Sequence, residues 1–240
     1  MALADMSLSG LRSVSSEDSV RYETIETRDG KFALLTLKPT NSHHLFTKKL
    51  IEKYSTRLQQ AVNDKVKGLI TTHDGEWFSG GFDYKSAPEE ELVVEFRKLI
   101  AQFLDLQFPT AAYVSGFTYG AGFTLALLHD YLVLSNDNVS LRQDELANGH
   151  ELPPYAAALV RDKFQLLASL ELLVSTKYVT PPQFAPIAEY VNPYVGWSKD
   201  EVVEKLLRPL VDLDGSNYSG VRKILLFRVY QLVKLEPARG

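Results

Sequence analysis

The chain has 240 residues, a formal net charge of −4 and no cysteine, and 45% of its residues are hydrophobic. This length and balance predict one globular domain with a sizeable core. The negative charge argues against nucleic acid as the main partner, because binding phosphate requires a basic surface, and the missing thiols exclude disulfides, thiolate zinc sites and a thiol nucleophile.

Neither end of the chain carries a clear targeting signal. The first twenty residues are rich in serine, include Asp5, Glu17 and Asp18, and lack the apolar core of a secretory signal. We expect residues 1–20 to be a mobile leader; a transit peptide is the alternative, which the acidic residues suit poorly. Residues 237–240 differ from the Ser-Lys-Leu peroxisomal address, and no apolar run approaches the roughly 20 residues that span a bilayer.

Strands and helices alternate in the first half of the chain. The predicted strands cover residues 21–27, 32–37, 67–72 and 111–114, and the predicted helices cover residues 50–62 and 88–107. Asp29 and Gly30 lie between the first two strands, which predicts a hairpin. Pro88 and the glutamates after it suit the first turn of the second helix. This alternation indicates an α/β fold.

The second half begins with a glycine-rich turn at Gly116 that leads into an apolar helix carrying His129 and Asp130. A pair of short strands is expected next, and the last third of the chain is mostly helical. Ser198 and Glu201 form a capping-box pair at the start of one of these helices. The helical segments predicted there cover residues 156–163, 166–175, 198–213 and 219–235, with a short element from Pro181.

Two glycine-rich turns, at residues 78–83 and 116–122, each follow a predicted strand, and Glu145 comes later among hydrophobic neighbours. Backbone N–H groups at two such turns, together with one carboxylate, suggest an oxyanion hole with a base. Apolar surroundings raise the pKa of a carboxyl towards that of a useful base. The alternative for Glu145 is a solvated loop carboxylate.

Other chemistries match the sequence poorly. The glycines at residues 120–122 lack the third glycine of a dinucleotide-binding fingerprint, and neither a P-loop lysine motif nor a G-x-S-x-G elbow is present. His43 and His44 are interpreted as loop or helix-entry histidines, since no carboxylate at ligand spacing accompanies them. His129 and Asp130 are too few ligands for a metal site, and a structural role at the end of the helix is favoured.

Three segments carry a family resemblance. They are WFSGGFD at residues 77–83, GFTYGAGF at residues 116–123 with the HDY that follows, and DELxxGxxLP at residues 144–153. In order and spacing they resemble the motifs of the crotonase, or enoyl-CoA hydratase/isomerase, superfamily, and most nearly its plant-type Δ3,Δ2-enoyl-CoA isomerases. The resemblance spans residues 21–163, and the helical remainder matches only loosely.

The resemblance implies an α/β fold, with a crotonase-like spiral of β-β-α units over residues 21–165. It also implies a C-terminal helical region over residues 166–240 that serves oligomerisation, as a homotrimer or hexamer. The expected substrate is an acyl-CoA thioester, with no cofactor beyond the coenzyme A that it carries and no metal. The expected location is the peroxisome, with the cytoplasm as the alternative because the C-terminal address is missing.

The resemblance also implies roles for individual residues. The backbone N–H groups of Phe82 and Ala121 would hold the thioester oxygen, and Glu145 would move a proton from C2 to C4 of a 3-enoyl thioester. The second glutamate of the superfamily's hydratases falls on Thr124, which cannot act as a base, so isomerisation is favoured over water addition. The residues expected to contact the substrate are Ser79, Gly81, Asp83, Lys85, Gly120, Gly122, Thr124, His150, Glu151 and Leu152.

Two positions depart from the isomerase pattern. His150 and Glu151 stand where isomerase relatives have less polar residues, which predicts a more polar acyl pocket or a second acid/base group. The alternative functions are therefore a hydratase, lyase or thioesterase that uses one of these residues on a specialised acyl-CoA, or a non-catalytic acyl-CoA-binding subunit. The candidates to meet the coenzyme phosphates are Lys85 and a basic face of the last helix with Arg222, Lys223 and Arg228. The alternative for that face is ordinary solvation.

Overall fold

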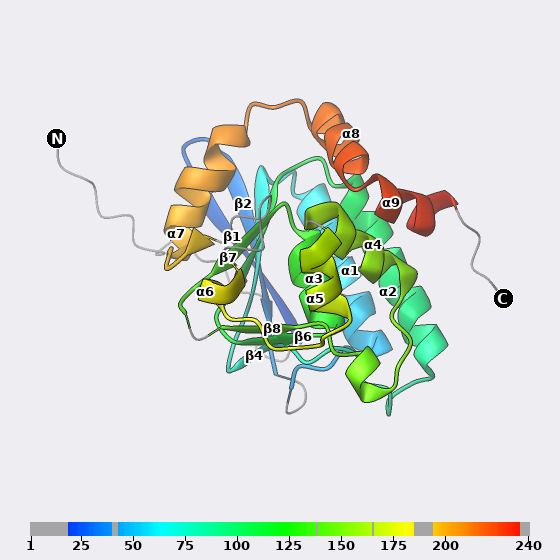
Figure 1. The fold of residues 1–240 in the computed structure, drawn as a ribbon. Coiled ribbons are helices and arrows are strands. Elements are labelled where there is room, and N and C mark those ends of the chain that lie inside the picture. The colour runs from blue at the N-terminus through cyan, green and yellow to red at the C-terminus, as the bar shows by residue number, and fades with distance from the viewer. Residues whose placement is uncertain (1–18, 40–42, 138, 165, 185–193, 236–240) are drawn as a thin grey trace.

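The computed structural model describes residues 19–39, 43–137, 139–164, 166–184 and 194–235 (Figure 1). Almost all of the predicted leader, residues 1–20, lies outside these ranges. Two sheets form the centre of the molecule, and helices cover both faces of the larger one. None of the helices that the structure describes is long and apolar enough to cross a membrane.

The larger sheet runs in the order β1-β2-β3-β5-β7-β9 within the described ranges. Its strands are β1 (Val20–Thr27), β2 (Gly30–Leu37), β3 (Gly68–His73), β5 (Thr110–Val114), β7 (Tyr131–Leu134) and β9 (Tyr194–Val195). The first two form the predicted antiparallel hairpin, with Thr27 opposite Gly30, and the other neighbours are parallel. Gly30 has a φ of 127°, which residues with a side chain rarely adopt. All four strands predicted in the first half of the chain are confirmed.

The smaller sheet consists of three-residue strands that run parallel to one another. They are β4 (Trp77–Ser79), β6 (Phe117–Tyr119) and β8 (Ser140–Arg142). The predicted strand pair after residue 130 is wrong as a pair, because β7 hydrogen-bonds to β5 in the larger sheet while β8 joins β6 in the smaller one. From β3 to β8, successive strands therefore alternate between the larger and the smaller sheet, so neighbours in sequence are not partners over this stretch.

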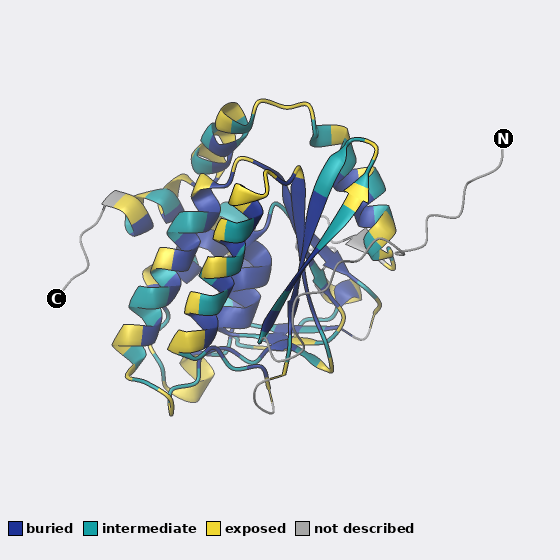
Figure 2. Cartoon of the chain, turned by 180° about the vertical axis from the view of Figure 1, so that it is seen from behind, coloured by how far each residue is buried: buried dark blue, intermediate teal, exposed yellow. Residues whose placement is uncertain are grey.

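The helices up to residue 163 pack on one face of the larger sheet (Figure 2). They are α1 (Lys48–Asn63), α2 (Glu89–Asp105), α3 (Ala121–Leu128) and α4 (Pro154–Lys163). The side chain of Thr47 caps α1 by accepting from the Leu50 N–H at 3.1 Å. Pro88 precedes α2, and three glutamates occupy its first turn, as predicted. The predictions for α1 and α2 are confirmed.

Helix α3 is shorter than predicted. It ends at Leu128, and His129 follows with an extended backbone as the chain turns into β7. The imidazole of His129 is buried, with 2.8 Å from Nδ1 to the Leu125 carbonyl oxygen and 2.8 Å from Nε2 to the Thr71 hydroxyl. These contacts agree with the structural role predicted for His129.

The last third of the chain is built from short helical pieces. They are α5 (Leu166–Leu173), α6 (Pro181–Phe184), α7 (Lys199–Val202), α8 (Gly215–Leu225) and α9 (Phe227–Tyr230). The predicted capping box of Ser198 and Glu201 opens α7, and wider and tighter helical turns continue it to Leu210. The single helix predicted over residues 219–235 is wrong, because the backbone leaves helical geometry at Leu226. This break lets the buried Leu226 and Val229 both face the core.

Valines and leucines directly after the start of α7 cover the outer face of the larger sheet. Val202, Val203, Leu206 and Leu207 pack there against Phe32, Leu34, Ile70, Ala111 and Val133. Strand β9 precedes α7 and pairs with β7 in parallel. The C-terminal third therefore contributes both a strand and a covering layer to the sheet that the earlier strands build.

Candidate active site

The two glycine-rich turns lie against each other. A Cβ atom added to Gly81 would lie 3.5 Å from the backbone nitrogen of Ala121 and 3.6 Å from the Cα of Gly120. A Cβ atom added to Gly122 would lie only 2.5 Å from the carbonyl oxygen of Ser79, so no larger residue fits without moving the backbone. Glycine at these positions therefore allows the end of β4 and the start of α3 to touch.

Both turns use backbone conformations that favour glycine. Gly81 has a φ of 98° and Gly120 a φ of 52°. Each glycine is followed by a buried residue, Phe82 in the first turn and Ala121 in the second. Neither backbone N–H group meets a protein acceptor in the part of the chain that the structure describes. Ala121 is the first residue of α3, where N–H groups have no partner within the helix.

Glu145 lies beside the second turn. A Cβ atom added to Gly120 would lie 3.2 Å from the Oε1 atom of Glu145, and the other carboxyl oxygen accepts from the Gln143 side-chain amide at 2.7 Å. Only 4% of Glu145 is exposed. Burial raises its pKa to about 7 and the charge of Asp144 adds to this, although hydrogen bonds from Gln143 and the local backbone oppose the rise. A carboxyl with this pKa can both take up and release a proton near neutral pH.

Two tyrosines that the sequence analysis did not single out lie near Glu145. Burial, followed by the charge of Glu145, raises the pKa of both Tyr84 and Tyr155. The hydroxyl of Tyr155 donates to the Val93 carbonyl oxygen at 3.4 Å. These tyrosines and Gln143 were not predicted as site residues, because none of them belongs to a sequence motif.

The predicted substrate-contact residues fall into two groups. The residues at the two turns and the start of α3 are Ser79, Gly81, Asp83, Gly120, Gly122 and Thr124. Ser79 and the glycines lie where the two turns touch, and Gly120 lies against Glu145. The Thr124 N–H donates to the Gly120 carbonyl oxygen at 3.0 Å. The hydroxyl oxygen of Ser79 accepts from the Gly81 N–H at 3.1 Å, which supports the first turn. Lys85 and Glu151 are exposed, and Leu152 is partly buried against the core. The imidazole of His150 is half-buried, and its Nδ1 atom lies 3.1 Å from Oε2 of Glu89.

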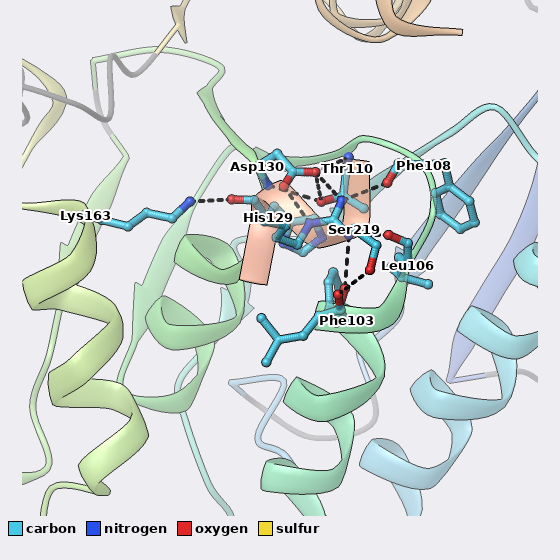
Figure 3. Close-up of polar contacts among 10 residues, drawn as sticks. Phe103, Leu106, Phe108, Thr110, His129, Asp130, Lys163 and Ser219 are labelled. Atoms are coloured by element: carbon cyan, nitrogen blue, oxygen red, sulfur yellow. Dashed lines mark hydrogen bonds and ion pairs between the residues drawn. The ribbon is translucent and has the colours of Figure 1, made fainter. Parts of the chain in front are cut away.

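The predicted basic face of the last helix is corrected by the structure. Arg222 is only 4% exposed, and its guanidinium donates to both carboxylate oxygens of Asp130 and to the carbonyl oxygens of Phe103, Leu106 and Phe108. Figure 3 shows these carbonyl groups close to Asp130. Beside them the Lys163 amine donates to the His129 carbonyl oxygen. The donors of Arg222 are thus used inside the protein, so the residue is neither solvated nor available to a phosphate.

The remaining cations of that face are also paired. Lys223 and Lys234 contact the two carboxylate oxygens of Asp105 at 2.8 and 2.6 Å, and Arg228 pairs with Asp162. Two of the residues named for the coenzyme phosphates are exposed. They are Arg228, which pairs with Asp162, and Lys85, which follows the first glycine-rich turn.

Comparisons with known proteins identify the family of the chain. The family model described as enoyl-CoA hydratase/isomerase matches residues 27–160. Enoyl-CoA delta isomerase 3 of Arabidopsis thaliana is 31% identical over 229 residues, which cover 88% of this chain and 95% of the relative. The peroxisomal enoyl-CoA delta isomerase 2 of the same plant is 36% identical over 170 residues, covering 65% of this chain and 70% of the relative.

Solved structures share the fold at lower identity. An enoyl-CoA hydratase from Mycobacterium avium superposes with a TM-score of 0.75 at 19% identity, covering 94% of this chain and 91% of that one. This likeness supports the fold alone, whereas the family model matches more than half of the chain. The chain therefore belongs to the enoyl-CoA hydratase/isomerase family and is an enzyme of the crotonase type.

Proposed function

We propose that this enzyme is an enoyl-CoA isomerase that converts a 3-enoyl-CoA into the conjugated 2-enoyl-CoA. The observation that carries the proposal is the buried carboxyl of Glu145, with its pKa of about 7, lying against Gly120 of the second glycine-rich turn. The next residue in that turn, Ala121, has a backbone N–H group without a protein acceptor among the described residues. A base and an oxyanion donor therefore stand side by side.

In the proposed mechanism the thioester oxygen accepts hydrogen bonds from the N–H groups of Phe82 and Ala121. Glu145 removes a proton from C2, and the electron pair of that C–H bond moves into the thioester and places negative charge on its oxygen. Each N–H donor aimed at such an oxygen is worth about 3–4 kcal/mol in the transition state. Glu145 then returns the proton to C4 as the double bond moves to C2–C3, so the carboxyl ends in its starting state. No cofactor is needed beyond the coenzyme A of the substrate.

One base favours isomerisation over hydration. Thr124 occupies the position of the hydratases' second glutamate, and it is buried in α3 with a hydroxyl that cannot act as a carboxylate base. The alternative reactions would draw on His150 or Glu151. Glu151 is exposed, and the Nδ1 atom of His150 contacts Glu89. Because this contact leaves Nε2 of His150 able to accept a proton, a water-activating role for His150 is tested directly by substitution.

The test is an ultraviolet assay for the conjugated thioester with 3-hexenoyl-CoA. Turnover should disappear in Glu145→Gln while binding of the thioester persists. Glu52→Gln, which changes an exposed carboxylate on α1, should retain full activity. Full activity in Glu145→Gln would refute the proposal. Water-dependent product from 2-enoyl-CoA that is lost in His150→Ala or Glu151→Ala would favour a hydratase, and tight binding without turnover would favour a binding subunit.

We also propose that the C-terminal helical region joins copies of the chain into a homotrimer or hexamer. Large apolar side chains on α5 and α8 are exposed in the single chain, and they are Leu166, Leu167, Leu170, Val221, Ile224 and Leu225. Exposed apolar patches of this kind mark interaction surfaces. Light scattering should give a trimeric or hexameric mass that Ile224→Glu reduces; a monomeric wild-type protein would contradict this.

For the location of the enzyme we propose the peroxisome. The support is that the enoyl-CoA delta isomerases 2 and 1 of Arabidopsis thaliana, which are 36% and 32% identical to this chain over the matched residues, carry this location in their names. Imaging of the full chain fused to a fluorescent protein at either end tests the proposal, and a uniform cytoplasmic signal for both fusions would refute it.

A further inference from the structure

The two loops that border the base are connected by a chain of side chains. Tyr84 follows the first glycine-rich turn, and its ring stacks on the imidazole of His150 with 3.5 Å between centroids and 13° between planes. The imidazole in turn contacts Glu89, the first residue of α2, with 3.1 Å between Nδ1 and Oε2. An ionised carboxylate only accepts hydrogen bonds, so the Nδ1 atom carries the hydrogen and donates it to Glu89.

The backbone of His150 is tied to the residue that carries the proposed base. Its N–H donates to the Glu145 carbonyl oxygen at 2.9 Å. Gly149 precedes it with a φ of 77°, a conformation that allows this short loop to close. The position of the His150 ring is therefore coupled to the backbone of Glu145.

Tyr84 links the same ring to the oxyanion turn. Its ring packs edge to face on Phe82, with 6.0 Å between centroids. Tyr84 is partly buried against the core, and after burial the charge of Glu145 is the largest cause that raises the pKa of its hydroxyl. The tyrosine thus lies within electrostatic range of the carboxyl and in contact with the residue that is proposed to hold the substrate oxygen.

From these contacts we propose that Tyr84 and His150 form a wall, tethered by Glu89, that closes one side of the Glu145 carboxyl. The wall keeps water from the carboxyl and fixes the base relative to the first glycine-rich turn. This inference rests on the proposed function of Glu145 as the base. Tyr84 and His150 act through Glu145 and are positioning residues.

The titratable groups around the base come from several elements. Asp144 lies on the segment of Glu145, Tyr84 precedes α2, and Tyr155 belongs to α4. Loss of the stacked rings admits water on the side of Tyr84 while Asp144 and Tyr155 remain. Hydration favours the charged form of a carboxyl, so the pKa of Glu145 should fall when the wall is removed.

The test measures the titration of Glu145 directly, without substrate. The carboxyl carbon of Glu145 is followed by NMR in protein labelled with ¹³C-glutamate, and Glu145→Gln identifies its signal. His150→Ala and Tyr84→Ala should each lower the titration midpoint by about one pH unit. Tyr84→Phe, which keeps both stacked rings and the Glu89 contact, should stay close to the wild type. His150→Phe keeps two rings but loses the contact with Glu89, so it should lower the midpoint less than His150→Ala does, and it also serves if an alanine variant fails to fold. Unchanged midpoints in the folded alanine variants would overturn the wall.

Kinetics separate positioning from a general loss of structure. In the 3-hexenoyl-CoA assay His150→Ala should lower kcat roughly tenfold, since small displacements of a base are costly, and shift the acid limb of kcat/KM to lower pH. Glu89→Ala should also lower kcat and shift the acid limb to lower pH, but by less. The control is Glu90→Ala, which changes an exposed neighbouring residue of α2 and should match the wild type. A His150→Ala variant with lower kcat but an unshifted acid limb would contradict the wall.

The two proposals fail in different ways. Wild-type protein that lacks isomerase activity, yet shows the shifted Glu145 titration in His150→Ala, would refute the function and leave the wall intact. If the wild-type enzyme is active but the titration midpoint of Glu145 is unchanged in His150→Ala and Tyr84→Ala, the wall alone is refuted.

Discussion

The guanidinium of Arg222 and the carboxylate of Asp130 form a two-pronged buried ion pair, with 2.8 Å from Nε to Oδ1 and 2.7 Å from Nη2 to Oδ2. The same carboxylate accepts from the N–H and the hydroxyl of Thr110 at 2.8 and 3.0 Å. Burial alone would raise the pKa of Asp130, but the charge and hydrogen bonds of Arg222 outweigh it and hold that pKa below its usual range. The pair fastens α8 to the start of β5 and β7.

Replacing Arg222 with leucine should therefore destabilise the protein strongly. The change leaves Asp130 buried without its partner, and breaking a buried pair from one side costs about 3–5 kcal/mol. Urea denaturation measures this loss as a fall in the free energy of unfolding. Lys223→Leu breaks a partly exposed contact with Asp105 and should cost less than about 1 kcal/mol. Equal losses of unfolding free energy in the two variants would show that the buried pair stabilises the protein no more than the exposed contact does.

Glu145→Gln should make the protein more stable at pH 8 while removing its activity. The folded-state pKa of Glu145 is about 7 against 4.5 for the free side chain, so between these values the folded state binds more protons than the unfolded one. The free energy of unfolding then falls as pH rises from 4.5 to 7, by on the order of 3 kcal/mol in total. Glu145→Gln has no carboxyl at this position, so its unfolding free energy does not fall for this reason.

The comparison needs unfolding curves of wild type and Glu145→Gln at several pH values. The difference between them should be small near pH 4 and grow until about pH 8. Groups that do not interact with Glu145 contribute equally to both proteins and cancel. A difference that does not depend on pH would mean that the carboxyl titrates as it does in the unfolded chain.

Much of the fold follows from local sequence patterns. The helical spacing of apolar residues such as Leu50 and Leu58 correctly predicts α1, and the alternation around Asp29 and Gly30 predicts the first hairpin. The three-residue strands β4 and β6 of the smaller sheet were not predicted, because three positions are too few to display an alternation, and β8 was expected but with the wrong partner. Their pairing across separate units is likewise a property of the whole spiral.

The candidate site also has parts that the sequence predicts and parts that it does not. Small residues at Gly120 and Gly122 indicate a close backbone approach, and the structure has that approach. The partners of His150 and Arg222 are 61 and 92 residues away in the chain, at Glu89 and Asp130. No local pattern connects residues so far apart, so sequence reasoning assigned the basic side chain of Arg222 to the surface.

The buried imidazole of His129 should make the protein sensitive to acid. Burial lowers its pKa to about 4, against 6.5 for the free side chain, so between these values the unfolded state binds the extra proton. Stability from this group is therefore complete above pH 6.5 and falls as pH drops towards 4, by on the order of 3 kcal/mol. His129→Gln should flatten the dependence of unfolding free energy on pH in that window. An unchanged slope would exclude His129 as the source of acid sensitivity.

Gly122→Ala should separate the two glycine-rich turns and abolish activity. The added Cβ atom would lie 2.5 Å from the Ser79 carbonyl oxygen, a backbone atom that cannot move aside as the end of a side chain can. The start of α3 must then shift away from β4, which carries the Ala121 N–H away from Phe82. Overpacking of this kind costs about 1–3 kcal/mol of stability.

The matched control is Gly220→Ala in α8, where nothing lies within 4 Å of the added atom. Because glycine weakens a helix interior, that control should gain roughly 0.5–1 kcal/mol of stability and keep its turnover. Urea denaturation measures the stability of both variants, and the 3-hexenoyl-CoA assay measures their turnover. A Gly122→Ala variant with normal turnover would show that the contact between the turns is not needed for catalysis.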